Sequence, residues 1–437
     1  MHELIAVGLE RRELLAAEKA ILVGISKLED EGLRSMRELA QLALSAGAVP
    51  VDVLVQIRKA PEPATYIGKG KLQELRALRL AADAEIVLFD AELTPVQVSN
   101  LVDELDCKVL DRTELILDIF AQHATSREGK LQVELAQLSY LLPRLVGKGP
   151  MMDRIAGGGG GGTAGGVGVR GPGETKLETD RRALRARMSR LKDQIEQVRR
   201  QREVEHRARE RSGLPLVSLV GYTNAGKSTL LNALVGSEEV RAHDRLFETL
   251  DTTIRRVEIQ GAQLLLSDTV GFIHNLPEDL FSAFMATLEQ LQQADVIIHV
   301  LDAGAPWAST ERQASEQILG RLGLADKPTI LVLNKWDELA GTPRAALMLA
   351  EMPDGLPISA AQGVGLEKLR ARIAEAAYAH LVPLSLQLPY DRLELLQLCR
   401  DHGRVLDTEY QDTHVAAVVE VNSELVAKLK PFVVALN

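Results

Sequence analysis

The sequence predicts an α/β protein built around a P-loop nucleotide-binding domain, in which helices cover both faces of a parallel sheet. Buried strands alternate with amphipathic helices along most of the 437 residues, as in sheets joined by crossover helices. The phosphate-loop pattern G-x-x-x-x-G-K-[ST] occurs at residues 221–229, between a buried strand and an apolar helix. Two leucine-rich helical stretches flank a glycine-rich segment, which indicates an antiparallel helical hairpin ahead of that domain.

Composition limits the class of protein. With 46% apolar and 26% charged residues, the chain is globular in type, and its length predicts two to four domains. The two cysteines, Cys107 and Cys399, form neither a disulfide framework nor a metal-binding spacing, which suits a reducing compartment. We find no signal peptide and no apolar run long enough to span a membrane, so we expect a cytoplasmic protein. The net charge of −10 argues against general coating of nucleic acid, and we expect no DNA partner.

Residues 1–120 predict a first α/β subdomain. We expect apolar strands at residues 20–25, 51–57, 85–90 and 108–112, with helical patterns between them. Parallel neighbours need such crossover connections, so this order predicts a parallel sheet.

Residues 121–212 predict the helical hairpin. Apolar side chains step by four and three residues along both arms, the spacing of a coiled-coil seam. The loop between the arms, residues 157–173, has glycine at eleven of seventeen positions and is expected at the tip. From residue 174 to 211 there are thirteen Lys/Arg and eight Asp/Glu, a net charge of +5. Such a basic face is either simply solvated or binds RNA phosphates. The seam residues are Leu131, Leu135, Leu138, Leu142 and Leu145 in the first arm, and Leu184, Met188, Leu191, Ile195 and Val198 in the second.

Residues 213–381 predict the nucleotide-binding domain, and residues 382–437 a small α+β tail. In the phosphate loop, backbone N–H groups and the following helix N-terminus favour phosphate binding. Lys227 is expected to reach the β- and γ-phosphates, and Ser228 to ligate Mg²⁺.

The base is selected by NKWD at residues 334–337. The Asp337 carboxylate can accept from N1–H and N2–H₂ of guanine, whereas adenine would leave it unpaired on burial. This disfavours an ATP-dependent enzyme and favours GTP. Asn334 is expected to tie this segment to the phosphate loop, and Lys335 to flank the guanine ring. SAA at residues 359–361 fits a backbone contact to the guanine oxygen.

The switch segments follow in order. In DTVG, Asp268 is placed to hold Mg²⁺ through water, and the N–H of Gly271 can meet the γ-phosphate. FETLDTT at 247–253 is the first switch, with Thr249 as the Mg²⁺ ligand and Thr252 or Thr253 as alternatives. We thus expect Lys227, Thr249 and Gly271 to be catalytic and Ser228, Thr249 and Asp268 to bind metal. The expected nucleotide site is Gly221, Tyr222, Thr223, Asn224, Ala225, Gly226, Lys227, Ser228, Thr229, Phe247, Thr249, Asp268, Thr269, Val270, Gly271, Asn334, Lys335, Trp336, Asp337, Ser359, Ala360 and Ala361.

Phe272 stands where many GTPases carry a glutamine that orients the attacking water. Because phenylalanine cannot hydrogen-bond water, we expect slow intrinsic hydrolysis or a partner that reorganises the site. His274 is close by and is either an ordinary loop histidine or an aid to catalysis.

At this point the sequence resembles the HflX branch of the translational GTPases related to Obg. The resemblance rests on GYTNAGKSTLLNAL, FETLDTT, DTVGFIHNLP, DRTELILDIFAQHATSREGKLQVELAQLSYLLPRL and GPGETKLETDRR, and it covers about residues 20–380. A hydrophobic residue at the position of Phe272 is also a feature of that group. The run of six glycines at residues 157–162 is longer than the family pattern.

The resemblance implies a monomeric GTPase that binds the large ribosomal subunit when loaded with GTP and splits stalled or idle ribosomes. Its partners would then be 23S rRNA and ribosomal proteins. The hairpin loop, mapped here onto residues 157–173, would approach the peptidyl-transferase region. With a ribosomal partner, RNA contact becomes the favoured role of the basic arm. An alternative is a GTP-regulated assembly factor or RNA chaperone that splits nothing.

Overall fold

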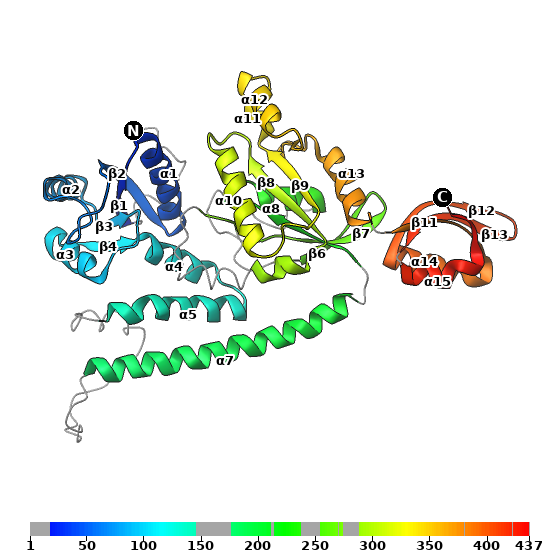
Figure 1. Cartoon of the computed structure of the whole chain (residues 1–437), viewed down its shortest axis with the longest axis horizontal. Coiled ribbons are helices and arrows are strands. Elements are labelled where there is room, and N and C mark those ends of the chain that lie inside the picture. Colours follow the sequence, from blue (N-terminus) through cyan, green and yellow to red (C-terminus); the bar gives the residue numbers. More distant parts are fainter. Residues whose placement is uncertain are drawn as a thin grey trace. The chain divides into compact units, whose positions relative to one another are not determined.

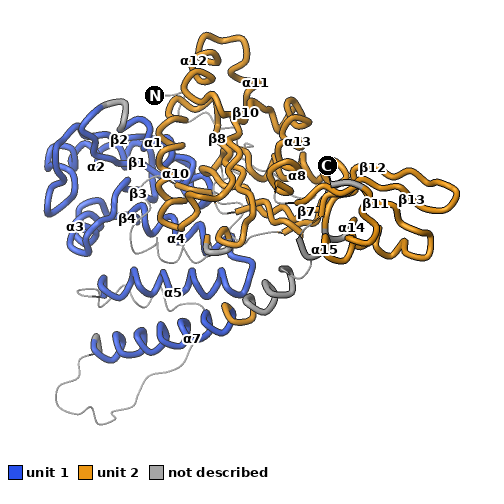
Figure 2. The backbone as a smooth tube through the Cα atoms, turned by 45° about the vertical axis from the view of Figure 1, so that its right-hand side comes forward, with its two compact units in different colours: residues 1–198, 276–283 blue, residues 199–275, 284–437 orange. Residues whose placement is uncertain are grey.

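A computed structural model describes residues 18–145, 176–210, 214–236, 254–269, 271–273, 288–379, 381–421 and 423–436. The described residues up to Val198 form one compact unit, and those from Arg199 form a second (Figure 2). Helix α7, Lys176–Glu210, contributes to both units. No helix in the described ranges is long and apolar enough to cross a membrane.

The first unit contains a parallel four-stranded sheet in the order β2-β1-β3-β4 (Figure 1). The strands are β1 Glu18–Ser26, β2 Ala48–Ile57, β3 Ile86–Phe89 and β4 Lys108–Asp111. They agree with the predicted strands. The crossover helices begin at recognisable signals: Thr94 forms a capping box with Gln97, and Pro95 occupies the first helical position.

Helices cover this sheet. Side chains of α2 and α3 share one apolar core with the strands, and α1 packs against β1, β2 and α4. The helices are α1 Glu29–Ser45, α2 Lys69–Ala82, α3 Pro95–Leu105 and α4 Arg112–His123.

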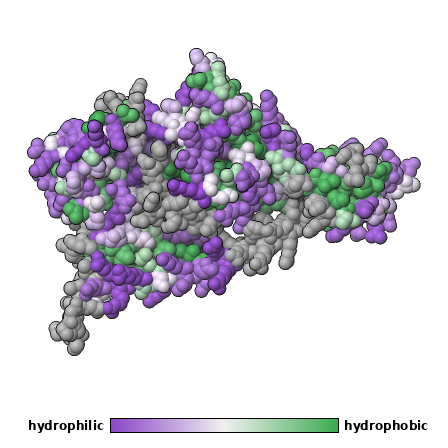
Figure 3. Space-filling model, in the orientation of Figure 1, coloured by the Kyte–Doolittle hydropathy of each residue, from purple (hydrophilic) through white to green (hydrophobic). Residues whose placement is uncertain are grey.

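Next to this sheet, α5, Arg127–Arg144, packs against α4 and runs beside α7 (Figures 1 and 2). On α7, Leu191 of the predicted seam is fully buried, and Arg187 pairs with Glu134 of α5 at 2.7 Å. On α5, the predicted seam is only half-buried. A second apolar stripe on α5 was not predicted. It faces α4 and is buried, and it consists of Val133, Ala136 and Tyr140. Figure 3 shows apolar surface along α5 and hydrophilic surface along the outer edge of α7.

The second unit is built on a sheet in the order β10-β9-β8-β5-β7, with β6 paired to β7. All of these neighbours are parallel except the β6–β7 hairpin. The strands are β5 Leu216–Val220, β6 Ile254–Ile259, β7 Ala262–Ser267, β8 Val296–Asp302, β9 Thr329–Asn334 and β10 Leu356–Pro357. Strand β6 was not predicted.

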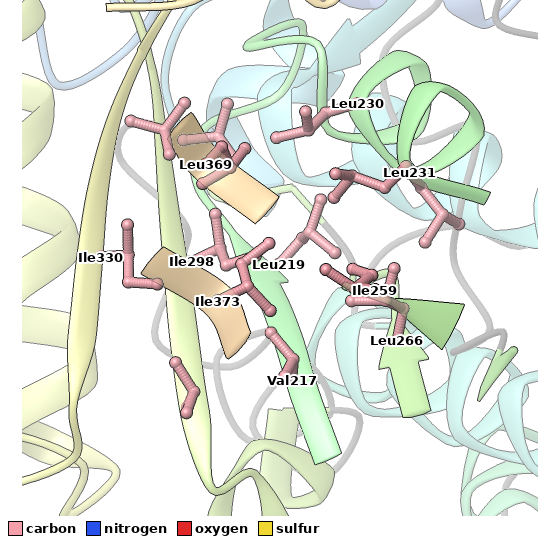
Figure 4. Close-up of a cluster of buried hydrophobic side chains, with 14 of the residues drawn as sticks. Val217, Leu219, Leu230, Leu231, Ile259, Leu266, Ile298, Ile330, Leu369 and Ile373 are labelled. Carbon is pink, nitrogen blue, oxygen red and sulfur yellow. The ribbon is translucent and has the colours of Figure 1, made fainter. Parts of the chain in front are cut away.

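Helices lie on both faces of this sheet. One apolar core joins the sheet to α8, Lys227–Val235, and α13, Leu366–Ala377 (Figure 4). A second core joins β8 and β9 to α10, Ala308–Arg321, and to α11, Trp336–Leu339, and α12, Pro343–Glu351. Together with the N-terminal sheet, this confirms the predicted α/β class.

Residues from Val382 onward form an antiparallel sheet in the order β12-β13-β11-β14. Helices α14 and α15 close its core, as the predicted α+β tail requires. Strand β12 also meets β7 at Arg404 and Ala262, so the two sheets of the second unit are continuous. The elements are β11 Val382–Pro389, α14 Leu393–His402, β12 Gly403–Tyr410, β13 His414–Val421, α15 Ser423–Leu429 and β14 Val433–Leu436.

Candidate nucleotide-binding site

The phosphate loop lies between the carboxyl end of β5 and the N-terminus of α8. Glycine is required at two of its positions. Gly221 has φ +148°, and a Cβ there would collide with the carbonyl oxygen of Val300. Gly226 has φ +86°, and a Cβ there would collide with the side-chain amide of Asn334. These glycines let the loop pack tightly on β8 and on the NKWD segment.

Lys227 is buried at the start of α8. Its Nζ donates to the carbonyl oxygens of Gly221 at 3.1 Å and Tyr222 at 2.7 Å. Burial lowers the pKa of Lys227 to about 8, and the nearby carboxylates of Asp268 and Glu311 oppose this shift. The ammonium is therefore held by its own loop in a position that phosphate oxygens can share.

Two side chains with oxygen donors, Ser228 and Asp268, lie close to Lys227 in the site. The Ser228 hydroxyl donates to Oδ2 of Asp268 at 2.9 Å, and the backbone N–H of Thr269 donates to Oδ1 at 2.9 Å. The Thr269 hydroxyl donates to the Leu219 carbonyl at 2.6 Å, which fixes this segment at the end of β7. A hydroxyl and a carboxylate are hard oxygen donors, so the pair fits Mg²⁺ with phosphate oxygens and water as further ligands. The described residues hold no cluster of three His, Cys, Asp or Glu that could bind a metal alone.

Asn334 connects the NKWD segment to the phosphate loop. Its Nδ2 donates to the carbonyl of Ala225 at 2.9 Å, and its Oδ1 accepts from the N–H of Ala360 at 3.0 Å. The side chain is buried, so both bonds are shielded from water. One amide thus holds together the loop, the end of β9 and the SAA segment.

The rest of NKWD is arranged around this amide. Lys335 has φ +57°, a left-handed conformation uncommon for lysine, and its Nζ pairs with Asp302 at 2.8 Å. The N–H of Trp336 donates to the Ile358 carbonyl at 3.0 Å. Asp337 is exposed and accepts from Nε2 of Gln362 at 3.2 Å. The expected penalty for leaving Asp337 unpaired thus applies only once a bound base covers it.

Phe272 is fully buried rather than directed at solvent. Its N–H donates to the Gly221 carbonyl at 3.0 Å, and its carbonyl accepts from the N–H of Thr223 at 2.9 Å. Its ring packs edge-on against Tyr222, with centroids 6.4 Å apart. The start of the second switch is thereby paired with the phosphate loop, and Gly271 lies directly against Thr223.

Some expected site residues cannot be placed. Phe247, Thr249 and Val270 lie outside the described residues, as do Thr252, Thr253, His274 and the loop 157–173. Their roles stay predictions.

Two carboxylates near this site were not predicted from the sequence. Asp302, which pairs with Lys335, ends β8, and its place at the carboxyl edge of a parallel sheet was a usable signal. Glu311 lies on the buried side of α10 and acts on Lys227 through space. No spacing in the sequence marks it.

Comparisons with known proteins agree with this geometry. Residues 33–121 match the family model of the GTP-binding GTPase N-terminal region, 123–209 the GTP-binding GTPase middle region, and 216–335 the 50S ribosome-binding GTPase. A crystal structure of SsGBP in complex with GDP is 27% identical, with a TM-score of 0.50 over 82% of this chain and 98% of that chain. The fold and the site define a P-loop GTPase, an enzyme that binds and hydrolyses GTP.

Relatives that match most of the chain identify the family within this class of GTPases. GTPase HflX of Caldanaerobacter subterraneus subsp. tengcongensis is 40% identical over 96% of this chain and 94% of its own length. GTPase HflX of Escherichia coli is 42% identical over 86% of both chains. The chain belongs to the HflX family of GTPases, as its motifs predicted.

Proposed function

We propose that this GTPase binds the large ribosomal subunit in its GTP-bound state, separates stalled or idle ribosomes into subunits, and is released by GTP hydrolysis. The observation that carries the proposal is the match of residues 216–335 to the 50S ribosome-binding GTPase model. A ribosomal partner would place the protein in the cytoplasm, where it would act as a monomer.

The basic face of α7 is the proposed contact with 23S rRNA. Arg185, Arg190 and Lys192 are exposed on this helix. Such cations bind RNA phosphates with a strong dependence on salt. The glycine-rich loop 157–173, which precedes this helix in the sequence, would contact the same RNA.

The nucleotide site would control this contact. Lys227 would bind the β- and γ-phosphates, the Gly271 N–H would meet the γ-phosphate, and Asp337 would select guanine. Ser228, Asp268 and Thr249 would hold Mg²⁺, which supplies positive charge to the phosphates. GTP would order the two switches, and hydrolysis would release them.

Phe272 supports a partner-dependent rate. Its side chain lies in the packed interior against Tyr222 and cannot orient a water molecule. We therefore infer slow intrinsic hydrolysis, accelerated when the ribosomal subunit rearranges the second switch.

Light scattering of purified whole ribosomes tests the proposal. With a non-hydrolysable GTP analogue, added protein should reduce the scattering as subunits separate, whereas GDP should not. Unchanged scattering with tight binding to subunits would instead favour an assembly factor or RNA chaperone.

A charge-reversal series tests the basic face separately. Arg181→Glu, Arg182→Glu and Arg185→Glu together should weaken subunit binding and flatten its salt dependence. Arg372→Glu, a single reversal at an exposed position on α13, is the control for added negative charge outside α7. Nucleotide affinity should stay the same in both, and a parallel loss of it would contradict an RNA-binding role.

A further inference from the structure

The C-terminal sheet has an exposed apolar edge. Tyr410 is 63% exposed, Tyr390 45%, Leu406 45% and Leu393 37%. Leu406 and Tyr410 belong to β12, Tyr390 to the turn between β11 and α14, and Leu393 to the start of α14. The Tyr390 hydroxyl donates to the Gln411 carbonyl at 2.7 Å, which joins the turn between β11 and α14 to the tip of the β12–β13 hairpin. We call the region formed by residues 390–394 and 406–414 the tyrosine edge.

The backbone of this edge is available for pairing. Strand β12 pairs with β13 along its length and meets β7 at Arg404. From Leu406 to Tyr410, its other side pairs with no strand in the described part of the chain. An unpaired strand presents backbone N–H and C=O groups that an extended segment can complete.

The charge of the tyrosine edge selects the partner. Residues 390–394 and 406–414 contain five carboxylates and one guanidinium, a net charge of −4 with histidine neutral. The carboxylates are Asp391, Glu394, Asp407, Glu409 and Asp412. This surface repels RNA phosphates and a second copy of itself, and it attracts Lys- and Arg-rich protein.

Protection of an edge strand is the simpler explanation for part of this pattern. Charged residues and a β-bulge, here between Val405 and Asp407, both discourage accidental strand pairing. Protection does not explain two exposed tyrosines beside an exposed leucine. Tyrosine is enriched in protein interfaces, and its ring binds cationic side chains.

We propose that the tyrosine edge binds a lysine- and arginine-rich extended segment of another protein, which adds to β12 as a further strand. Alternate basic side chains of that segment would meet Asp407 and Glu409, and others would lie over Tyr410. The inference goes beyond the proposed function, because it assigns the C-terminal sheet to protein contact, whereas the basic face of α7 is assigned to RNA.

A peptide experiment tests this without ribosomes. A fluorescent peptide of alternating lysine and valine should bind the full-length protein, as followed by anisotropy. The combined change Asp407→Lys and Glu409→Lys should weaken binding at least about tenfold, since two attractive charges become repulsive. The pair Glu367→Lys and Glu375→Lys on α13, where both side chains are exposed, is the control and should bind like wild type. Equal affinity of wild type and the Asp407/Glu409 variant would overturn the proposal.

Photo-crosslinking on the ribosome tests it in context. Tyr410 is replaced by p-benzoylphenylalanine, and Val434, exposed on the opposite edge strand β14, is replaced in the control. On large subunits with a GTP analogue, the Tyr410 probe should label a Lys/Arg-rich protein segment, and the Val434 probe should not. Labelling of rRNA or of a second copy, or no labelling despite co-sedimentation, would overturn the proposal. If the protein does not co-sediment with large subunits, that result contradicts the proposed ribosomal function. The peptide experiment then decides whether the tyrosine edge binds a basic segment.

Discussion

Removing the Asn334 side chain should disable nucleotide binding from a position that need not touch the nucleotide. In Asn334→Ala, the Ala225 carbonyl and the Ala360 N–H both lose their partner, at sites now paired at 2.9 and 3.0 Å. Leaving a buried polar group unpaired costs about 1–3 kcal/mol, so the pair costs about 2–6 kcal/mol. The lower value alone corresponds to about thirtyfold in affinity. We expect this loss in binding because nucleotide must then order the loop and the SAA segment itself.

Titration with fluorescent GDP measures the effect. Asn334→Ala should bind GDP at least about thirtyfold more weakly than wild type. Gln362→Ala is the matched control, because it removes a single exposed hydrogen bond to Asp337. It should change the affinity less than about threefold. If Asn334→Ala keeps its fold by circular dichroism and its GDP affinity changes less than threefold, Asn334 does not hold the phosphate loop and the SAA segment in the binding conformation.

Three further predictions concern Lys227 and Phe272 of the nucleotide site and His299 of β8. The pKa of Lys227 in the empty site is about 8, and bound phosphates raise it, so GDP affinity should be flat below about pH 7 and fall about tenfold between pH 7 and pH 9. A flat titration to pH 9 would contradict this. Phe272→Gln should not increase intrinsic GTP turnover and should lower the melting temperature more than Phe272→Leu, because it buries an amide against Tyr222; faster turnover would show that the side chain reaches the phosphates. His299 is buried in the middle of β8, and burial lowers its pKa from the ordinary 6.5 to about 4. Between these two values only the unfolded chain binds the proton, so stability falls as the pH is lowered. When the pH is lowered from 7 to 5, the free energy of unfolding measured in urea should fall by about 2 kcal/mol more in wild type than in His299→Leu. Equal losses would contradict the lowered pKa of His299.

The alternation of strands and helices was predictable because parallel sheets bury their strands on both faces. Segments such as 20–25 and 330–333 are therefore continuously apolar in the sequence. Strand β6, IRRVEI, escaped prediction because it is an edge strand of a hairpin, and its outward positions are charged. The second buried stripe of α5 was hidden for a related reason. A helix packed on two sides carries two overlapping apolar periodicities, and the leucine spacing of α5 predicts only one of them.

The site divides along similar lines. GKST and NKWD could be predicted because the local spacing of their residues sets their geometry. In the structure, a hydrogen bond from Asn334 brings the two segments together. Glu311 depends on the tertiary packing of α10, so no linear pattern marks it, whereas Asp302 could have been found from its place at the carboxyl end of β8. The burial of Phe272 was equally invisible, since it arises from backbone pairing between two distant loops.

The rate of GTP hydrolysis with and without large ribosomal subunits tests the central claim most directly. The buried Phe272 leaves the free protein without a residue at that position to orient water, while the proposed partner supplies the missing arrangement. Single-turnover rates should be slow for the protein alone and rise severalfold when large subunits are added, with small subunits as the control. Equal rates in the presence and absence of large subunits would contradict the account.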